Sequence, residues 1–278
     1  MSLSTVLFLF LAHLGVGIAL TLLFVSREAG VKFFRFNAGL AAILLVIALA
    51  FAFRDLNAAR PPGADAMTLG ISLVALVVST ALVVLYWAIV GRLFTRFRTA
   101  ILALAVIAGL FAIASQAIDV SAGRSLPFQA LTIASFLTSA AMLGGACTAM
   151  ILGHWYLVIP SMQVSHLQSI VRVHIGSMVA RVMVVGAAVW YALATAYAAN
   201  PVVGPTFRRY IMSVDGIFFW QRILFGLAGP AVLSYLTWET AKIRSTQSAT
   251  GILYVDFFTV VIGEVLAKYI VLATHVPV

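Results

Sequence analysis

Residues 3–25 read LSTVLFLFLAHLGVGIALTLLFV and contain no Asp, Glu, Lys or Arg. A helix of about 20 apolar residues is long enough to cross the hydrocarbon core of a bilayer. The stretch therefore predicts a transmembrane helix. We interpret it as a first span and not as a removed signal peptide, because no basic residue precedes it and no cleavage site follows Val25.

Further stretches of this kind follow along the whole chain. Of its 278 residues, 63% are hydrophobic and 9% are charged, whereas a soluble domain has about 25% charged residues. Lipid rather than water must cover such a surface. We predict an all-α fold, a polytopic transmembrane bundle of about eight helices that forms a single domain, residues 1–278. The predicted spans are residues 3–25, 37–53, 67–90, 100–118, 128–153, 167–198, 217–241 and 251–273.

The basic residues predict the orientation of the bundle. In a membrane protein, a net charge of +9 reflects basic cytoplasmic loops and does not indicate nucleic-acid binding. The odd-numbered loops carry more basic residues, so we expect both termini on the outer, periplasmic side. The odd loops hold Arg27, Lys32, Arg35, Arg92, Arg96, Arg98, Lys242 and Arg244, and the opposite loops hold Arg54, Arg60, Arg124, Arg208 and Arg209.

One histidine lies near the middle of the first span. His13 precedes Gly15 and Gly17, which allow a second helix or a flat ligand to approach closely. An imidazole can hydrogen-bond a quinone carbonyl, carry a proton or ligate haem iron. The alternative is a neutral histidine that bonds across helices. At the end of the fifth span, His154 and Tyr156 are either interface anchors or the mouth of a headgroup or quinone site.

Charged residues in three spans need partners, because a charge in hydrocarbon costs about 2.5–3.5 kcal/mol on insertion scales. Glu264 and Lys268 are four residues apart, which favours an ion pair within one helix. Asp256 has no such neighbour, and we expect its partner to be Arg181 or Arg222. Buried carboxylates with distant arginines also line proton paths. Near the end of the seventh span, Glu239 is expected to pair at the interface.

The residues give little support to a bound metal. The single cysteine, Cys147, excludes an internal disulfide and an iron–sulfur centre held by this chain alone. Haem b is possible, with His13, His154 and His174 as the candidate axial ligands, although no haem signature is present. Otherwise the chain is expected to hold no cofactor of its own.

The last span carries a motif that resembles a known family. The segments SATGILY (residues 248–254) and GEVLAKY (residues 263–269) are similar to the final helix of the NrfD/PsrC/DmsC-like quinone-interacting membrane anchors of bacterial oxidoreductase complexes. The family often has Arg where this chain has Lys268. His13 also resembles the quinone-contacting region of that family.

The resemblance implies electron transfer in a bacterial inner (cytoplasmic) membrane. It implies a multi-pass, quinone-reactive or non-catalytic subunit of a respiratory oxidoreductase, which exchanges electrons between an iron–sulfur partner subunit and membrane quinone and also anchors a catalytic subunit. His13, His154 and Tyr156 would bind the quinone. The proton path would contain Arg181, Asp256, Glu264 and Lys268. The alternatives are a small polytopic transporter, a b-type cytochrome subunit and a purely structural or assembly protein.

Overall fold

The computed structural model describes residues 3–56, 66–91, 97–158, 163–198 and 203–278, and these residues form helices and no strand. Eight of the helical segments are long and apolar enough to cross a membrane, which confirms the predicted number of spans. The elements are α1 Leu3–Leu22, η1 Arg27–Ala29, α2 Gly30–Leu56, α3 Ala66–Ile89, α4 Arg98–Val120, α5 Leu126–Val158, α6 Val164–Ala198, α7 Val203–Ile211, η2 Val214–Gly216, α8 Ile217–Ile223, η3 Leu224–Ala228, α9 Gly229–Lys242 and α10 Thr246–Thr274.

The predicted spans and the helices agree in order and differ mainly at the ends. The second span begins at Gly30, seven residues earlier than residue 37, so Lys32 and Arg35 lie in a helix and not in a loop. Their long side chains can still reach the membrane surface, and the Arg35 guanidinium lies 5.3 Å from the centre of the Trp87 ring. Of the basic residues used to predict orientation, Arg60, Arg92 and Arg96 lie outside the described residues.

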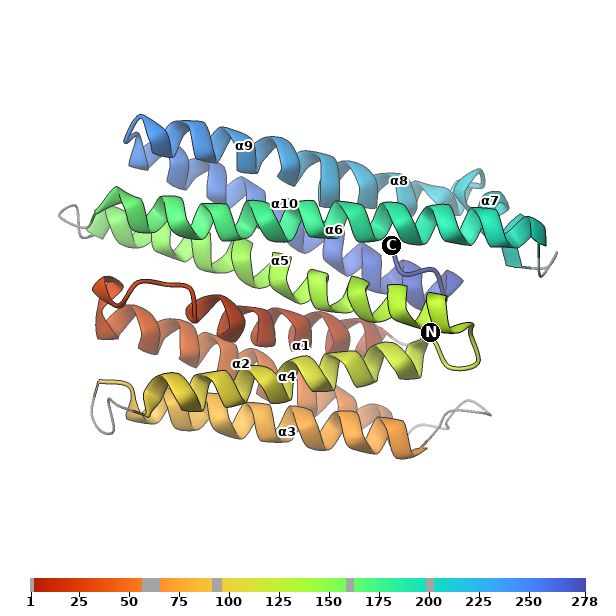
Figure 1. The fold of residues 1–278 in the computed structure, drawn as a ribbon, viewed down its shortest axis with the longest axis horizontal. Coiled ribbons are helices and arrows are strands. Elements are labelled where there is room, and N and C mark those ends of the chain that lie inside the picture. The colour runs from red at the N-terminus through yellow and green to blue at the C-terminus, as the bar shows by residue number, and fades with distance from the viewer. Residues whose placement is uncertain (1–2, 57–65, 92–96, 159–162, 199–202) are drawn as a thin grey trace.

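The helices form two four-helix groups that meet along α1 and α5 (Figure 1). In the first group, α1 to α4 contact one another in sequence and α4 returns to α1. In the second group, α5 and α9 each contact both α6 and α10. Consequently α6 and α10 face each other across the diagonal of the second group. Helices α1 and α5 have the largest buried share among the spans, as expected for the two helices at the junction.

The junction between the two groups depends on a close crossing of α1 and α5. A Cβ atom added to Gly17 would lie 2.0 Å from the Ala140 carbonyl oxygen, and one added to Gly144 would lie 2.0 Å from the backbone of Gly17. The two helices therefore touch through their backbones, as small residues allow in membranes. Next to this contact, the Thr21 and Thr148 hydroxyl oxygens are 2.7 Å apart.

The seventh span is interrupted, and Gly226, Gly229 and Pro230 lie at the break. It consists of α8, the π-helical turn Leu224–Ala228 and α9. Pro230 lies in the first turn of α9 and has no backbone N–H to donate to the preceding turn. A π turn adds one residue to the helical repeat and is frequent at functional sites.

One face of the bundle carries the first, third and seventh loops, at the left of Figure 1. We call it the basic face and define it by Arg27, Lys32, Arg98, Lys242 and Arg244. Helices α2, α4, α6 and α10 begin there, and α1, α3, α5 and α9 end there. Whether this face is cytoplasmic stays a prediction of the charge pattern.

The α1–α5 crossing gives a first testable prediction. Replacing Gly144 with Ala should lower the thermal unfolding midpoint of the protein in mild detergent, because overpacking of this kind costs about 1–3 kcal/mol. Gly70 on α3 is the matched control, since a Cβ atom there meets no atom within 4 Å. Equal midpoints for Gly144→Ala and Gly70→Ala would contradict the close crossing.

Candidate functional site

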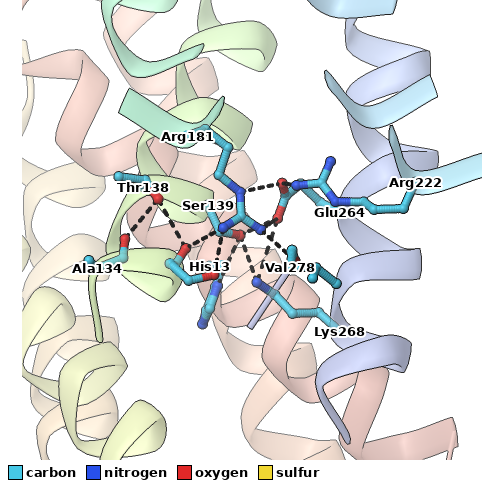
Figure 2. A network of polar contacts seen from close by, with 10 residues as sticks. His13, Ala134, Thr138, Ser139, Arg181, Arg222, Glu264, Lys268 and Val278 are labelled. Carbon is cyan, nitrogen blue, oxygen red and sulfur yellow. Dashed lines mark hydrogen bonds and ion pairs between the residues drawn. The ribbon is translucent and has the colours of Figure 1, made fainter. Parts of the chain in front are cut away.

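The centre of the second four-helix group is a cluster of charged side chains around Glu264, shown in Figure 2. We call it the Glu264 cluster and define it by Glu264, Lys268, Arg181, Arg222 and Ser139. These side chains come from α10, α6, α8 and α5, and His13 on α1 reaches the cluster from the first group. Glu264, Arg181 and Arg222 are all fully buried. The core of a helix bundle, where side chains of facing helices meet, is a usual place for a functional site.

Arg181 uses all five of its N–H donors. Its Nε and Nη2 donate to the two carboxylate oxygens of Glu264 at 2.9 and 3.2 Å, the two-point contact typical of an arginine–carboxylate pair. Its Nη1 donates to the carbonyl and hydroxyl oxygens of Ser135 at 3.0 and 2.6 Å. Nη2 also donates to the carbonyl oxygen of Val278 at 3.2 Å. This guanidinium is thus fixed in position on every side.

Arg222 reaches the same carboxylate from the interrupted seventh span. Its Nη2 donates to Glu264 Oε1 at 2.8 Å, whereas its Nε and Nη1 have no hydrogen-bond partner. The side chain passes over Gly226 in the π turn, where an added Cβ atom would lie 2.1 Å from Nη1. Gly263 on α10 contacts Gly226 equally closely. The two glycines thus bring the interrupted span against α10 and leave room for Arg222.

Ser139 joins Lys268 and His13 to Glu264. Its hydroxyl donates to Glu264 Oε2 at 2.5 Å and accepts from Lys268 Nζ at 2.7 Å. His13 Nδ1 lies 3.3 Å from the same oxygen. Because Ser139 has a single hydrogen, the His13 Nδ1 must carry the proton that it donates to Ser139. In a neutral ring, the His13 Nε2 is then an acceptor. No hydrogen bond satisfies it, although the buried side-chain amide of Gln116, which also lacks a hydrogen bond, lies close to the ring.

The cluster has more positive than negative charge. Three basic side chains surround one carboxylate, with Lys268 Nζ 3.6 Å from Glu264. The predicted pair of Glu264 with Lys268 is confirmed, but both arginines lie closer. Each arginine keeps its proton in a protein, and three cations hold the carboxylate in its charged form. Lys268 is therefore the group of this cluster that can release a proton most readily.

A second buried pair lies in the same core, nearer the basic face. His174 Nε2 is 2.7 Å from Asp256 Oδ2, and both side chains are fully buried. The prediction that Asp256 pairs with Arg181 or Arg222 is wrong, because both arginines bind Glu264. His174 and Arg181 are seven residues apart on α6, and Asp256 and Glu264 are eight apart on α10. Each interval is about two turns, so the contact of Arg181 with Glu264 also brings His174 to Asp256.

The two other residues predicted for a quinone site lie elsewhere. Tyr156 is 17 residues beyond Ser139 on α5, which is about 25 Å along a helix. Its hydroxyl donates to the Gln163 carbonyl oxygen and accepts from the Leu167 N–H. His154 is exposed, and its ring packs edge-on against Tyr254. Neither residue can contact the same ligand headgroup as His13.

The histidines considered for haem do not fit that role together. His174 Nε2 is occupied by Asp256, and its Nδ1 faces the backbone of α5, where a Cβ atom on Gly145 would lie 3.2 Å away. Neither nitrogen has space for an iron atom about 2 Å away, the usual length of a metal–imidazole bond. Among the residues that the structure describes, no three His, Cys, Asp or Glu side chains form a group that could hold a metal ion.

Glu239 lies in a partly exposed ion pair, as the sequence predicts, and Arg172 makes a contact with the neighbouring Trp238. Glu239 pairs with Lys242 at 2.6 Å, and both side chains are nearly half exposed. Arg172 lies over the Trp238 ring, with 5.9 Å from its guanidinium carbon to the ring centre. Exposed contacts of this type contribute little to stability.

The two serines and the pairing of His174 with Asp256 do not follow from the sequence patterns considered above. Ser135 and Ser139 carry no charge and are four residues apart in an ordinary transmembrane sequence, so no motif distinguishes them. His174 was considered only for haem. The matched intervals between His174 and Arg181 and between Asp256 and Glu264 are the signal that could have revealed the second pair.

Comparison with protein-family models and with curated protein sequences finds no match to this chain. The resemblance to quinone-interacting membrane anchors therefore stays a prediction.

The charge excess of the cluster gives a second testable prediction. Replacing Glu264 with Gln leaves three buried cations without a counter-charge, and breaking a buried pair in this way costs about 3–5 kcal/mol. We expect a lower yield of folded protein and a lower thermal midpoint.

The double variant Glu264→Gln, Arg222→Met should recover part of this loss, because it removes one uncompensated cation. Arg222 is the suitable second residue to replace, because two of its nitrogen donors already lack acceptors. A Glu264→Gln protein as stable as the wild type, or no recovery in the double variant, would contradict this description of the cluster.

Proposed function

We propose that this chain is the membrane-anchor subunit of a respiratory oxidoreductase complex, in which it exchanges electrons between an iron–sulfur partner and membrane quinone. The observation that carries the proposal is the buried Nε2 of His13 beside the Glu264 cluster, which no hydrogen bond satisfies and which has the equally unsatisfied amide of Gln116 near it. Intramembrane ionisable groups are functional candidates by default, since each is costly to place there. The bacterial inner membrane, the catalytic partner subunit and the quinone come from the family resemblance.

His13 has the chemistry that a quinone site needs. Reduction of a quinone takes two electrons and two protons and yields a hydroquinone. The iron–sulfur partner supplies the electrons. A neutral His13 with its proton on Nδ1 accepts a hydrogen bond from a hydroquinone hydroxyl at Nε2, and a protonated His13 donates one to a quinone carbonyl.

The cluster next to His13 can supply or accept the protons. Lys268 contacts Ser139, and Ser139 contacts His13, so the three side chains form a continuous hydrogen-bonded chain. Lys268 is the group that changes charge, while Arg181, Arg222 and Glu264 keep theirs. In this proposal the two arginines and Glu264 form a fixed electrostatic frame. When Lys268 is a neutral amine, the Ser139 hydroxyl turns its hydrogen from Glu264 to Lys268 Nζ. His13 Nδ1 then gives its proton to Ser139 while Ser139 gives its own to Lys268, and Nε2 takes up the proton of the hydroquinone.

A transporter is the second candidate, and the interrupted seventh span favours it. Transporters often place a broken helix at their substrate site near the middle of the membrane. Here the π turn lies directly beside Arg222 and Glu264. Uptake of a solute into vesicles that depends on Arg222, in a protein that shows no quinone-linked electron transfer, would favour the transporter.

The test is native purification in mild detergent, followed by a visible spectrum and mass spectrometry on the same sample. Iron–sulfur partner subunits and bound quinone should be present. A protein that purifies alone and without quinone would contradict the proposal. An absorption spectrum of b-type haem would instead favour the cytochrome subunit, and the ligands would then have to lie outside the His174 pair.

A third testable prediction concerns His13 itself. Replacing His13 with Ala should lower quinone-linked turnover of the complex by roughly 100-fold or more, as is usual for loss of a proton-transfer group. Assembly should be unchanged, because the exchange removes one 3.3 Å hydrogen bond from a buried site. His166, which pairs with the largely exposed Glu28 near the basic face, is the matched histidine control. Turnover that is equal in His13→Ala and His166→Ala would remove His13 from the quinone site.

A further inference from the structure

Residues 275–278 turn back into the bundle at the end of α10, and we call them the return segment. His275 is exposed and ends α10 with a left-handed backbone, at a φ of 61°. The three residues that follow it, Val276, Pro277 and Val278, are buried. The carbonyl oxygen of Val278 accepts a hydrogen bond from Arg181 Nη2 at 3.2 Å (Figure 2). A short non-helical segment thus leads from the face opposite the basic face to the Glu264 cluster.

The return segment belongs to a second, smaller apolar core of the bundle, to which it contributes Val276 and Val278. Other buried members of this core come from α6, α7, α8, η3 and α10, among them Val185, Phe207, Phe219, Leu227 and Ile270. Irregular backbone at membrane depth is tolerated where protein surrounds it. If the segment withdrew, this core would become an apolar pocket with Arg181 at its inner end.

The backbone of the return segment is held mainly by bonds that would travel with it. The N–H groups of His275, Val276 and Val278 donate to Val271, to the Thr274 hydroxyl and to Val276, all within residues 271–278. Pro277 has no N–H to donate. Among the described residues, the bond from Arg181 is the only hydrogen bond that joins the segment to another helix. A rotation of the backbone at the exposed His275 would therefore break one hydrogen bond and the apolar contacts.

Arg181 needs an acceptor in the place of Val278 whenever the segment is out. One hydrogen of its Nη2 binds Glu264 and the other binds Val278. A buried donor that loses its acceptor is destabilising, so another oxygen must replace the carbonyl. The Glu264 cluster has three cationic side chains against one carboxylate side chain. A negatively charged oxygen is thus favoured over a neutral one.

We propose that this part of the bundle is a binding site for an alkyl carboxylate, the chemistry of a free fatty acid in the membrane, and that the return segment occupies the site when the ligand is absent. The carboxylate accepts from Arg181 Nη2 in place of the Val278 carbonyl oxygen, and the alkyl chain replaces Val276 and Val278 in the second apolar core. Three extended residues span about 10 Å, which favours a short alkyl chain. The site rests on the geometry of the return segment and goes beyond the proposed function.

Binding of isotope-labelled octanoate to the protein in lipid nanodiscs tests the site, because its alkyl chain is about as long as the buried part of the segment. Removal of residues 276–278 should raise the affinity for octanoate at least about tenfold. A site that is filled in more than about nine-tenths of the molecules lowers the apparent affinity by that factor. His275→Gly is the matched control with unchanged affinity, since it keeps the segment and glycine accepts a φ of 61°.

A spin label at position 275 decides the question even where the shortened chain fails to fold. His275→Cys places the label at the exposed turn, and the protein's own Cys147 is buried. Saturating octanoate should increase the mobility of the label, because the ligand displaces the segment. Methyl octanoate has the same chain and a carbonyl oxygen but no charge, and it should leave the mobility unchanged.

Each alternative result overturns a stated part of the proposal. Equal octanoate affinities of the complete and shortened chains, or a label whose mobility octanoate does not change, would show that the return segment does not occupy a ligand site. Equal effects of octanoate and methyl octanoate would overturn the carboxylate as the ligand. None of these measurements involves quinone or electron transfer, so the failure of one proposal is distinguishable from the failure of the other.

Discussion

The contact of Glu264 with Arg181, Arg222 and Lys268 is the constraint around which the second half of the molecule is arranged. Four buried charges from three elements must meet within hydrogen-bond or ion-pair distance. The π turn and the Gly226–Gly263 contact place Arg222 there, and Ser135 with Val278 satisfies the remaining donors of Arg181. If α6, α8 or α10 shifted, one of these charges would lie in the membrane interior without a partner. The free energy of that state is far higher than the loss of a van der Waals contact.

Stability alone does not account for this cluster. Replacing a buried ion pair by apolar residues of similar volume is often neutral or stabilising, and the α1–α5 junction shows that close packing of small residues can join these helices. The unused donors of Arg222 and the free nitrogen of His13 make the arrangement more costly still. A chemical function is the simplest reason for charges in this position. The same reasoning applies to His174 and Asp256, which lie in the same core with unused atoms.

The sequence predicts the spans well and the partners of the charges poorly, for physical reasons. Twenty apolar residues in a row have one stable arrangement in a bilayer, so the helices follow from local composition. The pairing of Asp256 depends on which helices face each other, and α6 and α10 meet through side chains across a four-helix group. Glu264 and Lys268 could be paired because they share one helix. Ser139 could not be recognised, because a serine that bonds to its own helix is ordinary in such sequences.

The two buried groups differ in a way that assigns them different roles. A carboxylate with three cationic partners keeps its charge through any step that leaves those partners in place, so Glu264 provides a constant field. Asp256 has one imidazole partner, and its second carboxylate oxygen has no hydrogen bond. Arg222 is the arginine with fewer hydrogen bonds, and it is the one carried by the interrupted span. A change in the π turn that withdrew Arg222 would reduce the positive charge around Lys268 and strengthen its hold on a proton. The interrupted helix is thus the element that holds Arg222 against Glu264.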